Sequence, residues 1–111
     1  MLTVMDPDAA AFTMSARGER DVVLELAGEL DVVGASTLAE EIEAILAHGP
    51  DRLVVDLAEL DFVDSAGLAT LVHGHNAAEA AGTEFVLASP TRQCSELLEI
   101  TSLRTVFKIV N

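Results

Sequence analysis

Aromatic residues are scarce in this sequence, which has no tryptophan, no tyrosine and only four phenylalanines. Half of the 111 residues are nevertheless hydrophobic, and this content argues strongly against a disordered chain. Leucine, valine, isoleucine and alanine must therefore build the core, a composition typical of helices packed on buried strands. A chain of this length is sufficient for one domain with a core of its own.

Positive charge is scarce as well, because six Lys and Arg stand against nineteen Asp and Glu, for a formal net charge of −13. Nucleic-acid binding depends largely on basic side chains that neutralise phosphates, so the composition argues against a nucleic-acid partner. Anionic lipid surfaces are disfavoured for the same reason. The acidity favours either solubility alone or a partner with a basic contact face, and composition does not separate the two.

The sequence also lacks a second cysteine and any hydrophobic run of about 18 residues, the length that a membrane helix needs. Cys94 alone forms no intramolecular disulfide and no CxxC or Cys/His cluster, and it falls on the apolar stripe of a predicted helix. Residues 1–11 contain Asp6 and Asp8 rather than the basic segment of a signal peptide. We therefore expect a soluble, cytoplasmic domain over residues 12–111 after a flexible lead-in over residues 1–11, with no membrane partner.

The hydrophobic pattern alternates between strand and helix periodicity along the chain. It predicts strands at residues 12–16, 22–27, 53–57, 85–88 and 106–110, with helices between the later strands. Strands that alternate with helices of this length imply right-handed crossovers and a largely parallel sheet. The polar segment Arg17–Arg20 predicts an N-terminal hairpin. The predicted fold class is therefore α/β, with a mixed, mostly parallel sheet of about five strands and helices packed on it.

Each predicted helix has a candidate N-terminal signal. Thr37 and Glu40 fit a capping box for the first helix, which can also begin a few residues earlier. Ser65 is the expected N-cap of a second helix that runs to about residue 81 and stops at a glycine. Ser89 followed by Pro90 predicts the start of the third helix.

Ser65 carries the chemistry of interest, because it lies where a predicted loop over residues 58–64 becomes a helix. As an N-cap, its oxygen accepts a backbone N–H, which is the ordinary structural role of such a serine. A helix N-terminus also stabilises a phosphate through free N–H groups and the helix dipole. A hydroxyl in this place is therefore either a simple cap or a modification site.

The neighbours of this serine strengthen the second interpretation. We expect Phe62 and Val63 to anchor the loop from below while Asp61 and Asp64 face outward. Gly67 has no Cβ, so it allows another backbone to approach closely. The segment therefore predicts an acidic surface around an accessible hydroxyl.

Four segments carry a resemblance to a known family: Gly28-Glu29-Leu30-Asp31, Leu60 to Leu68 with Asp64-Ser65-Ala66-Gly67-Leu68 at its centre, Gly82 before an apolar strand, and Ser89-Pro90 before a helix. Together they resemble the STAS family over about residues 12–110. More narrowly, they resemble its free-standing bacterial members, the anti-sigma factor antagonists, also called anti-anti-sigma factors. The resemblance implies that residues 12–111 form a STAS domain.

The resemblance also implies a partner-switching mechanism. Antagonists of this kind bind an anti-sigma factor that is itself a serine kinase, and they thereby release a sigma factor for transcription. The kinase phosphorylates the serine that matches Ser65, and the phosphorylated form lets go. A separate serine phosphatase restores the unmodified form.

The same resemblance places Asp31 in the contact surface, since the matching position lies near the serine in that fold. The predicted partner-binding residues are Asp31, Asp61, Asp64, Ala66, Gly67 and Leu68. Ala66 departs from the family pattern, which often has Ser or Thr after the phosphorylated serine. Ala69 stands where a second glycine is common, and this affects how closely a partner packs.

A catalytic role for Ser65 would require a base within hydrogen-bond reach. His73 lies eight residues down the same helix, about 12 Å along the axis at about 1.5 Å per residue. His73 and His75 point about 200° apart around the helix, so they do not form a metal site. We therefore predict a binding protein rather than an enzyme, with no metal and no cofactor.

A second function keeps the fold and omits the phosphorylation. Some STAS modules act as scaffolds in sensory complexes, and the sequence does not separate this role from that of an antagonist. The two hypotheses differ in whether Ser65 is phosphorylated in the native cells.

Overall fold

The computed structural model describes residues 12–111, so the lead-in predicted for residues 1–11 lies outside the described residues. The described part of the chain contains strands β1 (Thr13–Arg17), β2 (Asp21–Leu30), β3 (Arg52–Val63), β4 (Glu84–Ala88) and β5 (Lys108–Val110), helices α1 (Val32–Ala47), α2 (Ser65–Ala81) and α3 (Arg92–Ile100), and the 3-10 turn η1 (Leu103–Thr105). Its strands form one five-stranded sheet in the order β1-β2-β3-β4-β5. Only the β1–β2 pair in this sheet is antiparallel. The predicted α/β class with a mixed, mostly parallel sheet is confirmed.

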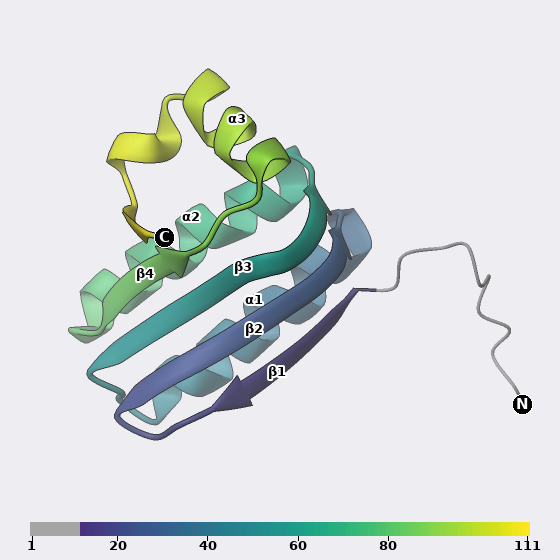
Figure 1. The fold of residues 1–111 in the computed structure, drawn as a ribbon. Helices are drawn as coiled ribbons and strands as arrows, with labels where there is room; N and C mark the ends of the chain where they lie inside the picture. Colours follow the sequence, from purple (N-terminus) through teal and green to yellow (C-terminus); the bar gives the residue numbers. More distant parts are fainter. Residues whose placement is uncertain (1–11) are drawn as a thin grey trace, which may run out of the picture.

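Helices α1 and α2 lie side by side behind the sheet in Figure 1, and α3 packs at the end of β3. The core between the layers is aliphatic, as the composition predicts. Its largest fully buried side chains include Leu24, Leu26, Leu30, Leu53, Leu57, Leu60 and Leu71. Full burial of one leucine side chain contributes about 1.5–3 kcal/mol, so these residues supply most of the driving force for folding.

Strand β3 is longer than predicted, because residues 58–63 continue the strand instead of forming a loop. Two register shifts against β2 explain the error, since β3 has one extra residue at each of them. Leu57, Leu60 and Val63 therefore all point into the core at a spacing of three residues. This spacing breaks the two-residue alternation that identifies a strand in a sequence.

The predicted capping box of α1 and the predicted N-cap of α3 are wrong, the alternative of an earlier start for α1 is confirmed, and the start of α2 is displaced by one residue. Helix α1 begins at Val32 rather than near Thr37, because Asp31 provides its N-terminal cap. The N-cap of α3 is Thr91 rather than Ser89, whose φ of 53° is left-handed. The N-cap of α2 is the residue before Ser65.

Several predicted turns and ends are confirmed. Gly18, with a φ of 97°, forms the hairpin between β1 and β2, and Gly82, with a φ of 78°, ends α2. The last strand is shorter than predicted, because Val106 and Phe107 form the turn and bend that follow η1 (Leu103–Thr105). Cys94 lies in the core, where burial raises the pKa of its thiol to about 11. No helix among residues 12–111 is long and apolar enough to cross a membrane.

Candidate functional site

Two strand-to-helix corners lie side by side at the carboxyl ends of β2 and β3. Leu30 and Val63, the last residues of the two strands, are partners in the sheet register. The backbone N–H of Asp64 donates to the carbonyl of Leu30 at 3.1 Å. Asp31 and Asp64, which follow the two strand ends directly, are therefore neighbours in space although 33 positions separate them in the sequence.

Each of these aspartates caps the helix that follows it. Asp31 Oδ1 accepts from the backbone N–H of Val33 at 3.0 Å and of Gly34 at 3.2 Å. Asp64 Oδ1 accepts from the backbone N–H of Gly67 at 2.9 Å. A cap of this kind contributes about 1 kcal/mol to helix stability. Asp64 is therefore half-buried and bound to the backbone, and the prediction that it faces outward is corrected.

The cap by Asp64 changes the role of the serine. Ser65 is the first helical residue of α2, so the prediction that its own oxygen caps the helix is wrong. Its side chain is exposed, and its hydroxyl forms no hydrogen bond with residues 12–111. The fold consequently does not depend on this hydroxyl, which is free to react or to contact a partner.

Gly67 and Leu68 lie beneath this surface. A Cβ on Gly67 would stand 2.7 Å from Leu30 Cγ and 2.9 Å from the Leu30 carbonyl oxygen, so the backbone that approaches this glycine is the chain's own strand β2. Leu68 is 2% exposed. Both residues hold the first turn of α2 against the sheet and thereby position Ser65, whereas Ala66 is half-buried at the surface.

Three large apolar side chains are exposed at the two corners. Val32 and Val33, at the start of α1, are 66% and 77% exposed, and Phe62, near the end of β3, is 41% exposed. The prediction that Val63 anchors the segment from below is confirmed, but the same prediction for Phe62 is wrong, because the shifted register turns Leu60 and Val63 inward and leaves Phe62 at the surface. The sequence contains no direct signal for Val32 and Val33, but a helix start at residue 32 would have placed them at the surface.

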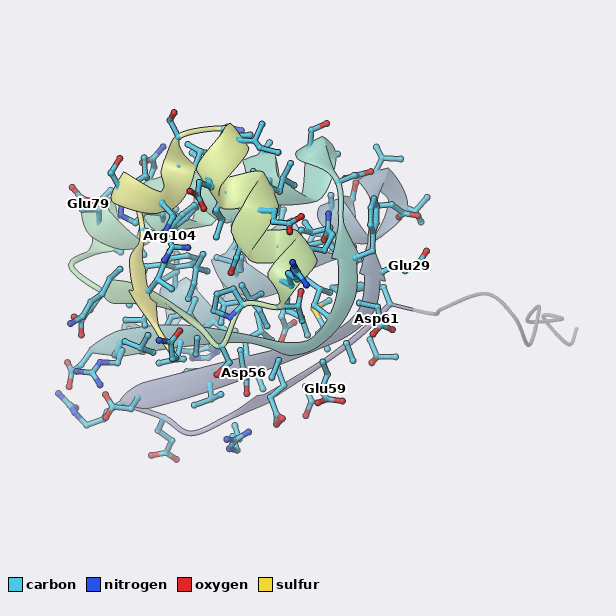
Figure 2. The ribbon with its side chains drawn as sticks, turned by 45° about the horizontal axis from the view of Figure 1, so that its top comes forward. Glu29, Asp56, Glu59, Asp61, Glu79 and Arg104 are labelled. Carbon is cyan, nitrogen blue, oxygen red and sulfur yellow. The ribbon has the colours of Figure 1, made fainter. Side chains whose placement is uncertain are left out.

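Carboxylates surround these apolar residues without neutralising cations. Asp61 is exposed as predicted, and Glu29, the sheet partner of Phe62, is exposed beside it. Figure 2 shows Glu29, Glu59 and Asp61 along the same side of β2 and β3. Within residues 12–111 no Lys, Arg or His nitrogen lies within 4.0 Å of these three carboxylates, because the cations pair elsewhere.

A shallow groove of about 290 Å³ begins at Ser65 and runs between α2 and the segment after α3. Its lining is mostly apolar and includes Leu68, Val72 and Leu103, with His73 exposed along it. Within residues 12–111 no group of three His, Cys, Asp or Glu side chains is placed to hold a metal ion. The arrangement presents a free hydroxyl on an exposed, acidic and partly apolar face of the protein.

Comparisons with known proteins agree with this architecture. The family model described as "Mlab, STAS domain" matches residues 13–110. The chain belongs to the STAS domain family. The resemblance inferred from Gly28–Asp31 and Leu60–Leu68 is thereby confirmed.

Individual STAS proteins extend the comparison. The chain is 30% identical over 96 residues to a protein named anti-sigma-B factor antagonist from Listeria monocytogenes, with 84% of each chain covered. The crystal structure of an anti-sigma factor antagonist from Mycobacterium paratuberculosis superposes with a TM-score of 0.78 at 24% identity, covering 96% of this chain and 90% of the other. The Bacillus protein SpoIIAA is 20% identical to this chain, and its structure is known in two forms. The unphosphorylated form superposes with a TM-score of 0.76, covering 91% of this chain and 89% of SpoIIAA. The phosphorylated form superposes with a TM-score of 0.70, covering 91% of this chain and 92% of SpoIIAA.

Proposed function

We propose that this STAS domain is an anti-sigma factor antagonist whose binding is ended by phosphorylation of Ser65. In its unmodified form it binds an anti-sigma factor with serine kinase activity, and a sigma factor is released as a result. The observation that carries the proposal is the exposed Ser65 hydroxyl, which the fold does not use, at the corner where Asp64 lies beside Asp31. The names of the curated relatives support the same function.

The site tolerates a phosphate without a change of fold. Because Asp64 provides the cap, a phosphate on Ser65 breaks no hydrogen bond within residues 12–111. The first turn of α2 also offers unpaired backbone N–H groups and the positive end of the helix dipole. The switch therefore acts at the contact surface rather than through refolding, in keeping with the similarity to SpoIIAA in both of its forms.

The partner should present basic side chains around an apolar centre. Glu29 and Asp61 form no ion pair with residues 12–111, and both adjoin the exposed Phe62, which is the sheet partner of Glu29 and follows Asp61 in the chain. Buried apolar anchors within a polar rim are typical of residues that dominate binding energy. Complementary charge around them accelerates association and selects the partner.

Phosphorylation weakens this contact locally. It adds about 1.5–2 negative charges and the bulk of a phosphate at a place that fits a hydroxyl. The long-range attraction to a basic partner persists, so the loss must come from steric exclusion at Ser65 and from the cost of desolvating a charged phosphate inside the contact. Loss of one central contact commonly costs about 2 kcal/mol, more than tenfold in affinity. A serine phosphatase that removes the phosphate completes the cycle.

The test is a pull-down from native cells with Ser65→Ala and Ser65→Glu baits. The alanine form should retain a partner that phosphorylates the wild-type chain on Ser65 in the presence of ATP, and the glutamate form should lose it. Ser15→Glu, on the exposed strand β1, adds the same charge away from the corners and should bind like the wild type. Equal capture by both Ser65 variants would refute the switch.

A phosphate-affinity gel of the native protein separates the antagonist from a non-phosphorylated scaffold. The antagonist should give a doublet at some growth stage, and Ser65→Ala should abolish its slower band. A single band at every stage would favour the scaffold.

A further inference from the structure

Gln93, the second residue of α3, forms two hydrogen bonds with the peptide groups of one residue of β3. Its Oε1 accepts from the backbone N–H of Val63 at 3.0 Å, and its Nε2 donates to the carbonyl of Val63 at 2.9 Å. A carboxamide bound in this way occupies the place that the backbone of a neighbouring strand would take. We call this pair of hydrogen bonds the Gln93 clamp.

The clamp is needed because β3 extends beyond its neighbour β4. Strand β4 pairs with β3 only from Arg52 to Asp56, whereas β2 pairs with β3 as far as Val63. The backbone groups of successive strand residues point to opposite edges. The N–H of Asp64 therefore points to β2, where Leu30 accepts it at 3.1 Å, and the groups of Val63 point to the edge that β4 leaves uncovered.

The position of Gln93 is itself well defined. Cys94 and Leu98 are fully buried and fasten α3 to the core, so the carboxamide is presented by a fixed helix. Val63 is fully buried as well, and its Cγ2 lies 2.8 Å from the place where a Cβ of Gly67 would stand. A movement of Val63 would therefore be transmitted to the first turn of α2, which carries Ser65.

We propose that Gln93 is a positioning residue that holds the end of β3 on the side of α3 and thereby sets the location of Ser65 for phosphoryl transfer. This inference rests on the proposed function, because it concerns the efficiency with which a kinase uses Ser65. Gln93 does not touch the hydroxyl. It acts through Val63, which is held by β2 on one edge and by the clamp on the other.

The clamp is tested first by amide hydrogen exchange of the free protein, which requires no partner. Gln93→Leu keeps a branched side chain, one bond shorter, and removes both hydrogen bonds. Exchange at Val63 should become about tenfold faster, as expected for the loss of hydrogen bonds of ordinary strength, while exchange at Leu24 in the centre of β2 stays unchanged. Glu99→Gln, on the exposed side of the same helix, is the matched control and should exchange like the wild type. Unchanged protection at Val63 in Gln93→Leu would overturn the clamp.

The positioning role is tested by the kinetics of Ser65 phosphorylation, with the kinase that the Ser65→Ala bait captures. In Gln93→Leu we expect kcat to fall about tenfold, because a misplaced serine hydroxyl slows phosphoryl transfer. KM should stay within about twofold, because Asp31 and Val33 at the other corner remain available for binding the kinase. Partial unfolding would instead lower the amount of folded substrate and raise the apparent KM at constant kcat. An unchanged kcat together with faster exchange at Val63 would overturn the positioning role.

A second variant covers the case in which Gln93→Leu does not fold. Gln93→Glu retains the acceptor for the N–H of Val63 but loses the donor to its carbonyl, so faster exchange and a lower kcat are expected again. If no kinase phosphorylates the wild-type chain, the positioning role of Gln93 is refuted together with the proposed function. The exchange measurement still supports or overturns the clamp in that case.

Discussion

The corner from β2 into α1 and the corner from β3 into α2 share one construction. Each has a buried apolar residue at the end of the strand, an aspartate cap, two further residues and then a glycine packed on the strand ends. The two segments are Leu30-Asp31-Val32-Val33-Gly34 and Val63-Asp64-Ser65-Ala66-Gly67. The aspartate caps the helix and the glycine allows the helix to pack closely on the strand ends. The side chains of the two positions between them have no such structural role.

The corners differ in what occupies those free positions. Val32 and Val33 present apolar surface, whereas Ser65 presents a hydroxyl. Because the backbone is the same, the difference in function must come from the side chains and from what holds each corner in place. The N-cap and the glycine are therefore structural signals, and the positions between them are the ones available for a contact with a partner.

The largest expected effect concerns the two glycines. Gly67→Ala should destabilise the fold by about 2–3 kcal/mol, because the new Cβ meets Leu30 Cγ at 2.7 Å and the fixed backbone oxygen of Leu30 at 2.9 Å. Gly34→Ala meets only side-chain atoms, the nearest at 2.9 Å in the ring of Phe12, and should cost less than about 1 kcal/mol. Urea denaturation measures the free energy of unfolding of both variants. Equal losses of this free energy would contradict the proposed difference between the two corners.

The next effect concerns the first helical position of each corner. Ser65→Glu should lower the affinity for the partner more than about 30-fold, and Val32→Glu should lower it as well if both corners belong to one surface. The folding stability of both variants should be retained, since a carboxylate near a helix N-terminus is favourable by about 0.3–1 kcal/mol. Isothermal titration calorimetry gives the affinities. Binding by Ser65→Glu at wild-type strength would contradict the proposed surface.

A smaller effect is expected for the two caps. Asp31→Ala and Asp64→Ala should each destabilise the protein by about 1 kcal/mol, which thermal denaturation measures. The loss at Asp31 should be the larger one, because its carboxylate accepts two backbone hydrogen bonds and that of Asp64 accepts one. A loss at Asp64 far above that at Asp31 would indicate a further structural role of the second corner.

The smallest effect concerns the apolar surface. Val33→Ser should leave stability within about 0.5 kcal/mol, because the side chain is 77% exposed. It should weaken partner binding by about 1 kcal/mol, or about fivefold, if the valine is buried on binding. Ile100→Ser, at the end of α3, removes a comparably exposed side chain and should bind like the wild type. Equal affinities of Val33→Ser and the wild type would exclude Val33 from the contact.

Helix α2 was predicted to within one residue of its observed bounds, because its apolar stripe and the glycine after it are local signals. The start of α1 was missed, since two β-branched valines and a glycine after Asp31 are poor helix formers while Thr37 and Glu40 imitate a capping box. Tertiary packing outweighs this local preference. The second half of β3 was missed because its register shifts are defined only by pairing with β2.

The sequence by itself determined that Ser65 stands between a buried strand and a helix in a strongly acidic chain, since hydrophobic periodicity and charge are properties of the chain alone. The tertiary structure decided that Asp64 caps the helix, that Asp31 lies beside it and that Phe62 faces outward. It also decided that Gln93 forms two hydrogen bonds with Val63, directly before the serine corner. These features depend on the pairing of parallel strands and the packing of α3, which bring together residues about thirty positions apart through backbone hydrogen bonds that no local pattern records.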